Sequence, residues 1–146
     1  MKRRLLFYSV LIVGLLTSCA DEEENPLPYV HVDFSIPLSP QYPKLIAGLS
    51  EKVQRGYYGY QKNGVIIVPQ SFSNNNYEAF DATCTRNIIE EDTAINSINV
   101  DENGFTATCP TCRTVYNLLS GYAQNQSFRL QRYKAHMSNG RVYVRN

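Results

Sequence analysis

Short runs of alternating apolar and polar residues constrain the fold of this chain more than any other feature. The clearest run covers residues 30–38, where Val, Val, Phe, Ile and Leu occupy every second position. A period of two places these side chains on one face of a β-strand. No window of about a dozen residues has the 3.6 period of an amphipathic helix, and the best helical candidate is one turn within residues 45–55. The sequence therefore predicts an all-β fold.

Turn residues separate the other apolar runs. Asn63-Gly64 precedes one run, Asp101 to Gly104 separates two others, and Ser138 to Gly140 separates the last two. Gly and Asn are typical of tight turns because they tolerate backbone conformations that other residues avoid. Short strands at this spacing are typical of a small sandwich or barrel. The expected strands are residues 30–38, 65–68, 77–82, 94–100, 105–108, 128–136 and 141–144.

The first 18 residues have the pattern of an export signal. Three basic residues precede an apolar run, residues 5–16, which is too short to span a bilayer as a helix. Leu16-Thr17-Ser18-Cys19 then resembles the lipobox of bacterial lipoproteins, in which the Cys is acylated and becomes the mature N-terminus. We therefore expect residues 1–18 to be a lipoprotein signal peptide, and lipidated Cys19 to hold the protein on a membrane.

An acidic run and two prolines follow Cys19. Asp21 to Glu24 is typical of a solvated tether, and it also resembles the signals that send some lipoproteins of Gram-negative bacteria to the outer face of the outer membrane. Asn25-Pro26-Leu27-Pro28 predicts a short stiff linker. The expected organisation is a signal peptide (1–18), a lipidated Cys with its linker (19–28) and one domain (29–146). The expected location is the outer membrane, facing the periplasm or the cell surface.

The charge balance argues against nucleic acid as a partner. The formal net charge is +1, and it falls to −2 without the three basic residues of the signal. No basic stretch remains that could follow a phosphate backbone. The sequence also has no motif for hydrolysis and no phosphate-binding Gly loop, so we do not expect an enzyme.

Three of the four cysteines follow the linker, and several chemistries are open to them. Cys109-Pro110-Thr111-Cys112 is a C-x-x-C pair, and Cys84 lies twenty-five residues upstream. A catalytic dithiol would begin a helix, but the residues after Cys112 are strand-like. A zinc site would need four ligands, and neither His31 nor His136 lies at a ligand spacing. The third alternative is a local Cys109–Cys112 disulfide, with Cys84 as a buried thiol.

The order and spacing of these residues resemble the Rieske family. Rieske domains hold a [2Fe–2S] cluster on two loops, C-x-H and C-x-x-H, with two thiolates on one iron and two imidazoles on the other. The first loop corresponds to residues 80–86 and the second to residues 109–116; a Ser120-Gly121 turn follows. The resemblance covers residues 57–146. It implies an all-β, Rieske-like small sandwich or barrel with a two-loop cluster-binding subdomain.

The resemblance implies that Cys84 and Cys109 are the two thiolate ligands. Arg86 stands at the position of the first His, and Cys112 at that of the second. A thiolate is a competent ligand, but a guanidinium is not, because it stays protonated and has no lone pair to offer. Asp81 is the nearest residue with suitable chemistry for a fourth ligand.

Three hypotheses for the function follow. The first is a membrane-anchored structural or binding module with a Rieske-like domain that lacks a complete [2Fe–2S] ligand set; the missing ligand favours this one. The second is an electron-transfer protein that binds a [2Fe–2S] or other metal centre through Cys84, Cys109 and Cys112 and docks on a redox partner in the envelope. The third is a thiol–disulfide redox protein that uses the C-x-x-C pair. At most, the chain is expected to carry electrons.

Overall fold

A computed structural model describes residues 25–70, 76–90, 96–125 and 127–146. The predicted signal peptide, Cys19 and the acidic run Asp21 to Glu24 lie outside these residues. The start of the described chain lies against the domain, because Leu27 is buried and Gln131 Nε2 donates a hydrogen bond to Asn25 Oδ1 at 3.1 Å. Within the described residues, no helix is long and apolar enough to cross a membrane.

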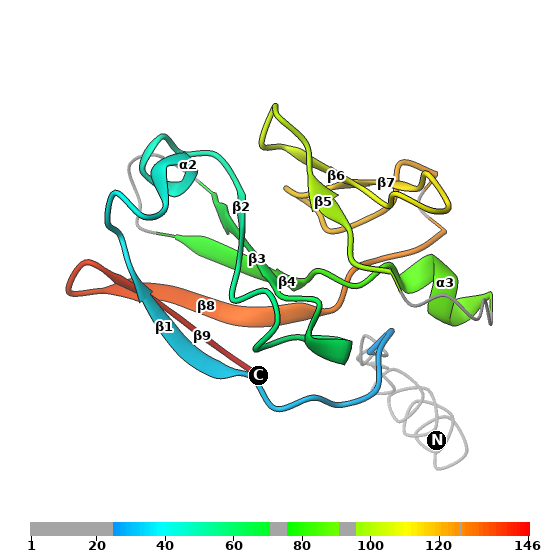
Figure 1. Cartoon of the computed structure of the whole chain (residues 1–146), viewed down its shortest axis with the longest axis horizontal. Helices are drawn as coiled ribbons and strands as arrows, with labels where there is room; N and C mark the ends of the chain where they lie inside the picture. Colours follow the sequence, from blue (N-terminus) through cyan, green and yellow to red (C-terminus); the bar gives the residue numbers. More distant parts are fainter. Residues whose placement is uncertain (1–24, 71–75, 91–95, 126) are drawn as a thin grey trace, which may run out of the picture.

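The strands of the described chain form two antiparallel sheets (Figure 1). The larger sheet has the order β1-β9-β8-β4-β3-β2, and the smaller sheet has the order β5-β6-β7. The all-β prediction is therefore confirmed. The strands are β1 (Asp33–Pro37), β2 (Glu51–Val53), β3 (Val65–Pro69), β4 (Tyr77–Asp81), β5 (Asn99–Val100), β6 (Thr106–Thr108), β7 (Val115–Asn117), β8 (Arg132–Ser138) and β9 (Arg141–Arg145).

The helical segments of the described chain are short. They are α2 (Pro43–Ile46), η1 (Tyr60–Lys62) and α3 (Thr85–Ile89). The turn expected within residues 45–55 overlaps α2 only at its end, and β2 occupies part of that range. The sequence did not predict α3, because a helix of five residues is too short to show a 3.6 period.

Both predicted hairpins are present. Strands β5 and β6 pair across the turn that ends at Gly104, and β8 and β9 pair across Asn139-Gly140. Asn139 and Gly140 have φ values of +50° and +70°, as a two-residue turn of type I′ requires. The strand expected over residues 128–136 begins later, at Arg132.

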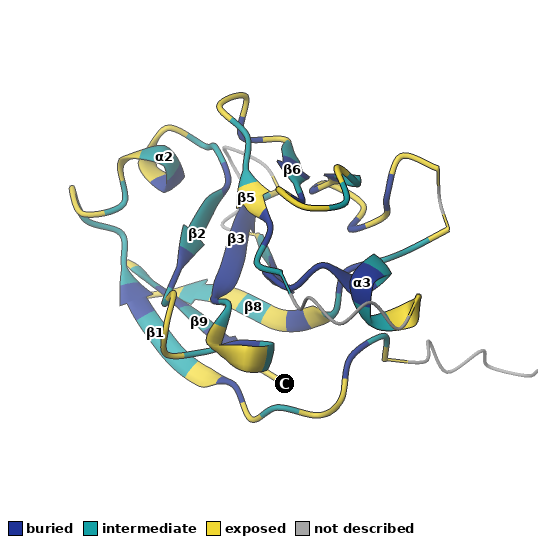
Figure 2. Cartoon of the chain, turned by 45° about the vertical axis from the view of Figure 1, so that its right-hand side comes forward, coloured by how far each residue is buried: buried dark blue, intermediate teal, exposed yellow. Residues whose placement is uncertain are grey.

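Strand β3 separates two clusters of buried side chains, and Figure 2 shows it buried along its length. Ile66 and Val68 belong to the cluster between the two sheets, whereas Val65 and Ile67 belong to the cluster within the larger sheet. Successive side chains of a strand point to opposite faces, so an unbroken apolar run contributes side chains to both clusters. The first cluster also contains Cys84 and Cys109.

Gly121 lies against the ring of Phe80 in the first cluster. Its φ is +80°, and a Cβ there would lie 2.6 Å from Phe80 Cε1. We expect Gly121→Ala to lower the free energy of unfolding by about 2–4 kcal/mol, because the ring must shift and the backbone is strained. Gly140→Ala is a matched control with φ +70° and no atom within 4 Å, so we expect a loss of about 1 kcal/mol. If urea denaturation shows that both variants lose the same free energy of unfolding, the contact of Gly121 with Phe80 does not have the effect assigned to it.

Lys52 connects the two sheets. From β2, its Nζ donates hydrogen bonds of 2.8–3.1 Å to Ile98 O, Asn99 Oδ1 and Ser97 Oγ. Burial, and then repulsion from Arg55, lower the pKa of Lys52 from 10.5 to about 8. Between these values the unfolded chain binds more protons than the folded chain, so stability rises with pH. We expect Lys52→Met to remove this rise when urea denaturation is compared at pH 8 and pH 9.5, whereas an unchanged slope would contradict the assignment.

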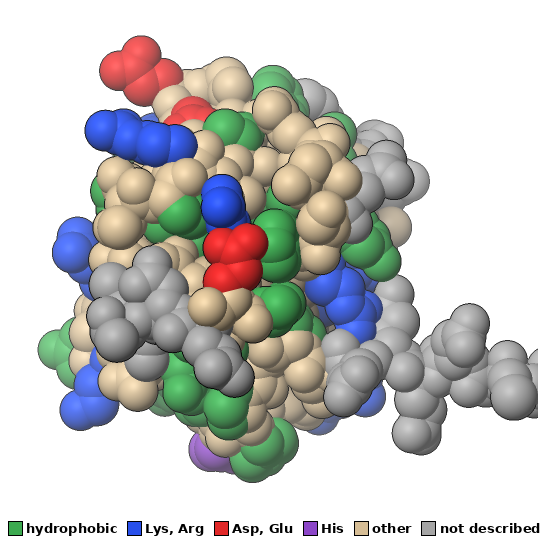
Figure 3. All heavy atoms as spheres, turned by 90° about the vertical axis from the view of Figure 1, so that its right-hand side faces the viewer, with side chains coloured by type: hydrophobic (Ala, Val, Ile, Leu, Met, Phe, Trp, Pro, Cys, Tyr) green, Lys and Arg blue, Asp and Glu red, His purple; other side chains and the backbone are tan. Residues whose placement is uncertain are grey.

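Charged side chains are dispersed on the face of the molecule at the α3 end. Figure 3 shows basic and acidic groups lying singly among hydrophobic and neutral ones on this face. Among the described side chains of this face, no broad patch of one sign is visible.

Candidate metal centre

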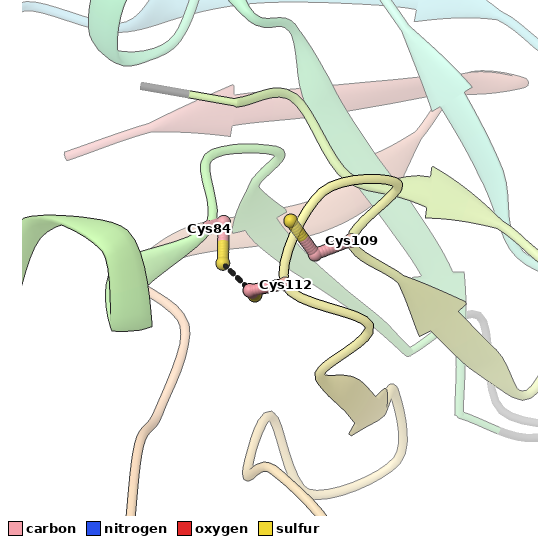
Figure 4. A group of neighbouring side chains, drawn as sticks. All are labelled: Cys84, Cys109 and Cys112. Carbon is pink, nitrogen blue, oxygen red and sulfur yellow. Dashed lines mark hydrogen bonds between the residues drawn. The ribbon is translucent and has the colours of Figure 1, made fainter. Parts of the chain in front are cut away.

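Three cysteine side chains converge where two loops meet (Figure 4). Cys84 lies between β4 and α3, and Cys109 and Cys112 lie on the turn between β6 and β7. The three Sγ atoms all lie within 4.8 Å of one another. Cys84 and Cys109 are buried, and Cys112 is half-buried. The fold therefore brings together the three residues that the sequence predicted as ligands.

Backbone hydrogen bonds shape the second loop. Cys109 N donates to Thr114 O at 2.9 Å, and Arg113 N donates to Cys109 O at 3.1 Å. Arg113 has φ +60°, which lets the chain reverse within four residues. This tight turn keeps Cys109 and Cys112 on the same side, facing the first loop.

Asp81 holds the first loop and is not a ligand. It is fully buried; its Oδ2 accepts hydrogen bonds from Tyr133 OH and Tyr60 N, both at 2.6 Å, and its Oδ1 accepts one from Thr83 N at 2.9 Å. Burial raises the pKa of Asp81, and these hydrogen bonds lower it only in part. The expectation that Asp81 could be a fourth ligand is wrong, because both oxygens bind structural donors and Asp81 is not part of the group formed by the thiols.

Arg86 bonds to other residues, not to a sulfur atom. Its Nε donates to Glu90 Oε2 at 2.8 Å, and its Nη1 donates to Thr114 Oγ1 at 3.4 Å. The hydrogen bond and charge of Glu90 raise the pKa of Arg86, so the guanidinium stays cationic. This side chain, which the sequence resemblance matches to the first Rieske-type His, therefore links the two loops and offers no lone pair.

Two residues that the sequence analysis missed contact the thiols. Tyr116 OH lies 3.5 Å from Cys84 Sγ and accepts the N–H of Arg86 at 3.2 Å. Thr114 Oγ1 lies 3.1 Å from Cys112 Sγ. Tyr116 lies on β7 and Thr114 directly precedes this strand, two positions earlier, so the two side chains face the same side. This alternation was the signal that could have identified them.

Two of the thiols differ in acidity. Burial raises the pKa of Cys84 to about 12. Burial also raises the pKa of Cys112, but hydrogen bonds with Thr114, Cys109 and Cys84 outweigh it and place the pKa below the usual 9.0. Cys112 therefore ionises at a lower pH than Cys84. A bound cation would stabilise both thiolates, because the attraction between opposite charges is stronger in a buried site than in water.

All three cysteines are free thiols. The expected Cys109–Cys112 disulfide is wrong for this structure. Cys109 Sγ donates to Asn87 Oδ1 at 3.7 Å, whereas Cys112 Sγ faces Cys84 Sγ at 3.5 Å. The turn thus brings Cys112 Sγ into contact with Cys84 Sγ on the other loop, while all three sulfur atoms stay within 4.8 Å of one another.

The two histidines lie on the surface, as predicted. His31 is exposed before β1, and His136 is exposed on β8, where it stacks on Tyr143 with ring centroids 5.3 Å apart. Across the described ranges, no His, Asp, Glu or further Cys joins the three sulfur atoms. The site therefore offers three thiol ligands from two loops.

The arrangement of strands and loops matches solved structures. No protein-family model matches the sequence, and neither does any curated protein. The plasma membrane Rieske protein PetC3 of the cyanobacterium Synechocystis PCC 6803 is 18% identical, with a TM-score of 0.50. The alignment covers 81% of this chain and 100% of that one. The chain has a Rieske fold.

Two other solved structures align with this Rieske fold at lower scores. The ferredoxin of carbazole 1,9a-dioxygenase from Nocardioides aromaticivorans IC177 is 11% identical, with 80% of this chain and 97% of that chain covered and a TM-score of 0.44. The E. coli protein NirD is 12% identical, with 80% and 98% covered and a TM-score of 0.43. The predicted fold class, with its two-loop subdomain, is confirmed by PetC3.

The group of three thiols differs from the ligand set of a Rieske cluster. A Rieske [2Fe–2S] centre uses two thiolates and two imidazoles, one pair on each iron. The sequence resemblance matches three thiols and a guanidinium to these four positions, and among the described residues the structure brings only the three thiols together. Three sulfur atoms within 4.8 Å of one another instead suit one ion, because tetrahedral zinc with bonds of about 2.3 Å places its sulfur ligands about 3.8 Å apart.

Proposed function

We propose that this chain is a lipid-anchored envelope protein whose Rieske-fold domain binds one thiophilic metal ion, zinc, through Cys84, Cys109 and Cys112. The observation that carries the proposal is the convergence of three free Sγ atoms within 4.8 Å, from two loops, in a largely buried position. Thiolates select soft and borderline ions such as zinc. With three protein ligands, the fourth position of the tetrahedron is open to water or to a ligand from outside.

The surroundings support three thiolates at this point. Three thiolates on a divalent ion carry one net negative charge. The cationic Arg86 guanidinium is close to them, because it donates a hydrogen bond to Thr114 Oγ1, which in turn contacts Cys112 Sγ. Tyr116 OH and Thr114 Oγ1 lie within 3.5 Å of Cys84 Sγ and Cys112 Sγ, respectively. Hydroxyl groups at these distances can donate to bound thiolates and orient them, which is how outer residues stabilise a metal site.

The lipid anchor in this proposal rests on the sequence. The basic start, the apolar run of residues 5–16 and the lipobox-like Leu16 to Cys19 support it. Acyl chains on Cys19 would give stable attachment, because two or more chains on one residue bind a bilayer far more strongly than one. The domain would then lie close to the membrane, since only five residues separate Cys19 from Asn25.

Metal analysis of the full-length chain tests the proposal. The protein is purified in detergent without oxygen, and its zinc, iron and acid-labile sulfide are measured. We expect one zinc per chain, and cobalt in its place should give the visible absorption of cobalt–thiolate bonds. Cys84→Ser, Cys109→Ser and Cys112→Ser should each weaken zinc binding by more than about 100-fold, since each removes a ligand. His136→Ala is the control and should leave the affinity unchanged.

Two results would overturn the metal assignment. Two irons with two sulfides per chain would make the domain a cluster protein and an electron carrier. Failure to bind zinc, cobalt or iron after reconstitution would leave a Rieske fold that serves as a binding module alone. The anchor is tested separately, because Cys19→Ser should abolish incorporation of labelled palmitate without changing the metal content.

A further inference from the structure

Two sulfur atoms from different loops are in contact. Cys84 Sγ and Cys112 Sγ lie 3.5 Å apart, and the dashed line in Figure 4 marks this contact. The partner of Cys112 within the C-x-x-C pair, Cys109, directs its thiol to Asn87 Oδ1 instead. Sequence spacing therefore suggests one pair of reactive cysteines, and the tertiary structure presents another.

Access to the two sulfur atoms differs. Cys84 is fully buried, whereas Cys112 is half-buried on the turn between β6 and β7. A reagent from solvent therefore reaches Cys112 more readily than Cys84, and Cys84 Sγ lies 3.5 Å from Cys112 Sγ. This is the arrangement of an attacking cysteine with a resolving cysteine within reach.

We infer that Cys84 and Cys112 form a disulfide between the two loops when no metal ion is bound. The reaction is an exchange with a disulfide supplied from outside, either an envelope protein with an exchangeable disulfide or a small disulfide. The metal ion and the disulfide use the same sulfur atoms, so each excludes the other. This competition rests on the proposed metal site, whereas the choice of cysteines rests on the contact between the loops.

The exchange proceeds in two balanced steps. The Cys112 thiolate attacks one sulfur of the external disulfide, which breaks, and its second sulfur leaves as a thiolate. The Cys84 thiolate then attacks Cys112 Sγ and releases the first external sulfur. In total, Cys84 and Cys112 lose two electrons and two protons, and the external disulfide is reduced to two thiols.

The neighbouring surface indicates how a protein carrying such a disulfide would bind. Helix α3 begins directly after Cys84, and on the face at this end the charged side chains lie singly among hydrophobic and neutral ones (Figure 3). A partner that binds this face would depend on shape and apolar contact, because the described side chains of the face show no broad charged patch that could steer it.

Peptide mapping of the full-length chain tests the inference. Trypsin cleaves after Lys62, Arg86 and Arg113, so Cys84 falls in residues 63–86, and Cys109 and Cys112 fall together in residues 87–113. The chain is stripped of metal, treated with oxidised glutathione and digested without reduction. A Cys84–Cys112 disulfide joins two peptides, whereas a Cys109–Cys112 disulfide closes a ring within one.

We expect the joined peptides in the wild type and in Cys109→Ser, and their loss in Cys112→Ser. Fragmentation between residues 109 and 112 assigns the bond in the wild type even where a variant fails to fold. A ring within residues 87–113, a bond to Cys109, or only mixed disulfides with glutathione would overturn the pairing.

A parallel sample with one equivalent of zinc tests the competition. We expect zinc to abolish the joined peptides. If they form equally with zinc present but unbound, the proposed metal site fails while the pairing of Cys84 with Cys112 stands. If zinc binds and the peptides still form, the competition is wrong.

Discussion

Replacement of Asp81 by Ala is expected to lower the free energy of unfolding by about 3–5 kcal/mol. The carboxylate accepts hydrogen bonds from Tyr133 OH, Tyr60 N and Thr83 N in a fully buried position. Without it, two buried donors and the partly buried Tyr60 N lose their acceptor at once, and each loss of a buried partner costs about 1–3 kcal/mol. The relief from no longer burying a carboxylate offsets only part of this loss.

Tyr133→Phe is the matched control for Asp81→Ala. It removes one of the three hydrogen bonds and leaves no buried donor without a partner, so we expect a loss of about 1–2 kcal/mol. Urea denaturation followed by circular dichroism measures both variants. Since Asp81 holds the loop that carries Cys84, Asp81→Ala should also weaken zinc binding. A loss no larger than that of Tyr133→Phe would contradict the role assigned to the carboxylate.

Arg86→His combined with Cys112→His is expected to convert the site into one that assembles a [2Fe–2S] cluster. The double variant gives two thiolates and two imidazoles at the four positions that the sequence resemblance matches to Rieske ligands. After reconstitution with iron and sulfide, we expect about two irons per chain and visible colour. The wild type treated in the same way should form no cluster.

The control for this conversion is Arg86→Gln combined with Cys112→His. It removes the same guanidinium and the same thiol but adds only one imidazole, so it should stay free of cluster. Iron and sulfide analysis and the visible spectrum distinguish the two variants. If the double-His variant folds and takes up no iron, the residue types at these two positions do not by themselves determine whether the domain assembles a cluster.

The strands were predictable because their signal is local. Alternation over residues 30–38 and the Asn-Gly turn before β9 depend only on neighbouring residues, and the structure has β1 and the β8–β9 hairpin at these places. Helix α3 was not predictable in this way. Its five residues begin after Cys84. The backbone N–H of Arg86, in its first turn, donates to Tyr116 OH, which belongs to β7 and lies thirty residues further along the chain.

The candidate ligands were also predictable, because their residue types and spacing resemble those of a known family. Their pairing was not. The C-x-x-C spacing suggested a bond between Cys109 and Cys112, yet the fold places Cys112 against Cys84, twenty-eight residues away. Asp81 was a possible ligand by chemistry, and its three donors in the fold make it a structural residue.

The sequence by itself determined the all-β class, the two loops and the three cysteines as candidate ligands. These follow from periodicity, turn residues and residue types, which act over a few positions along the chain. Only the tertiary structure decided that three thiols converge, that Arg86 bonds to Glu90 and Thr114, and that Cys112 faces Cys84. Contacts between segments tens of residues apart depend on how the two sheets pack around β3. Local sequence patterns do not predict that packing.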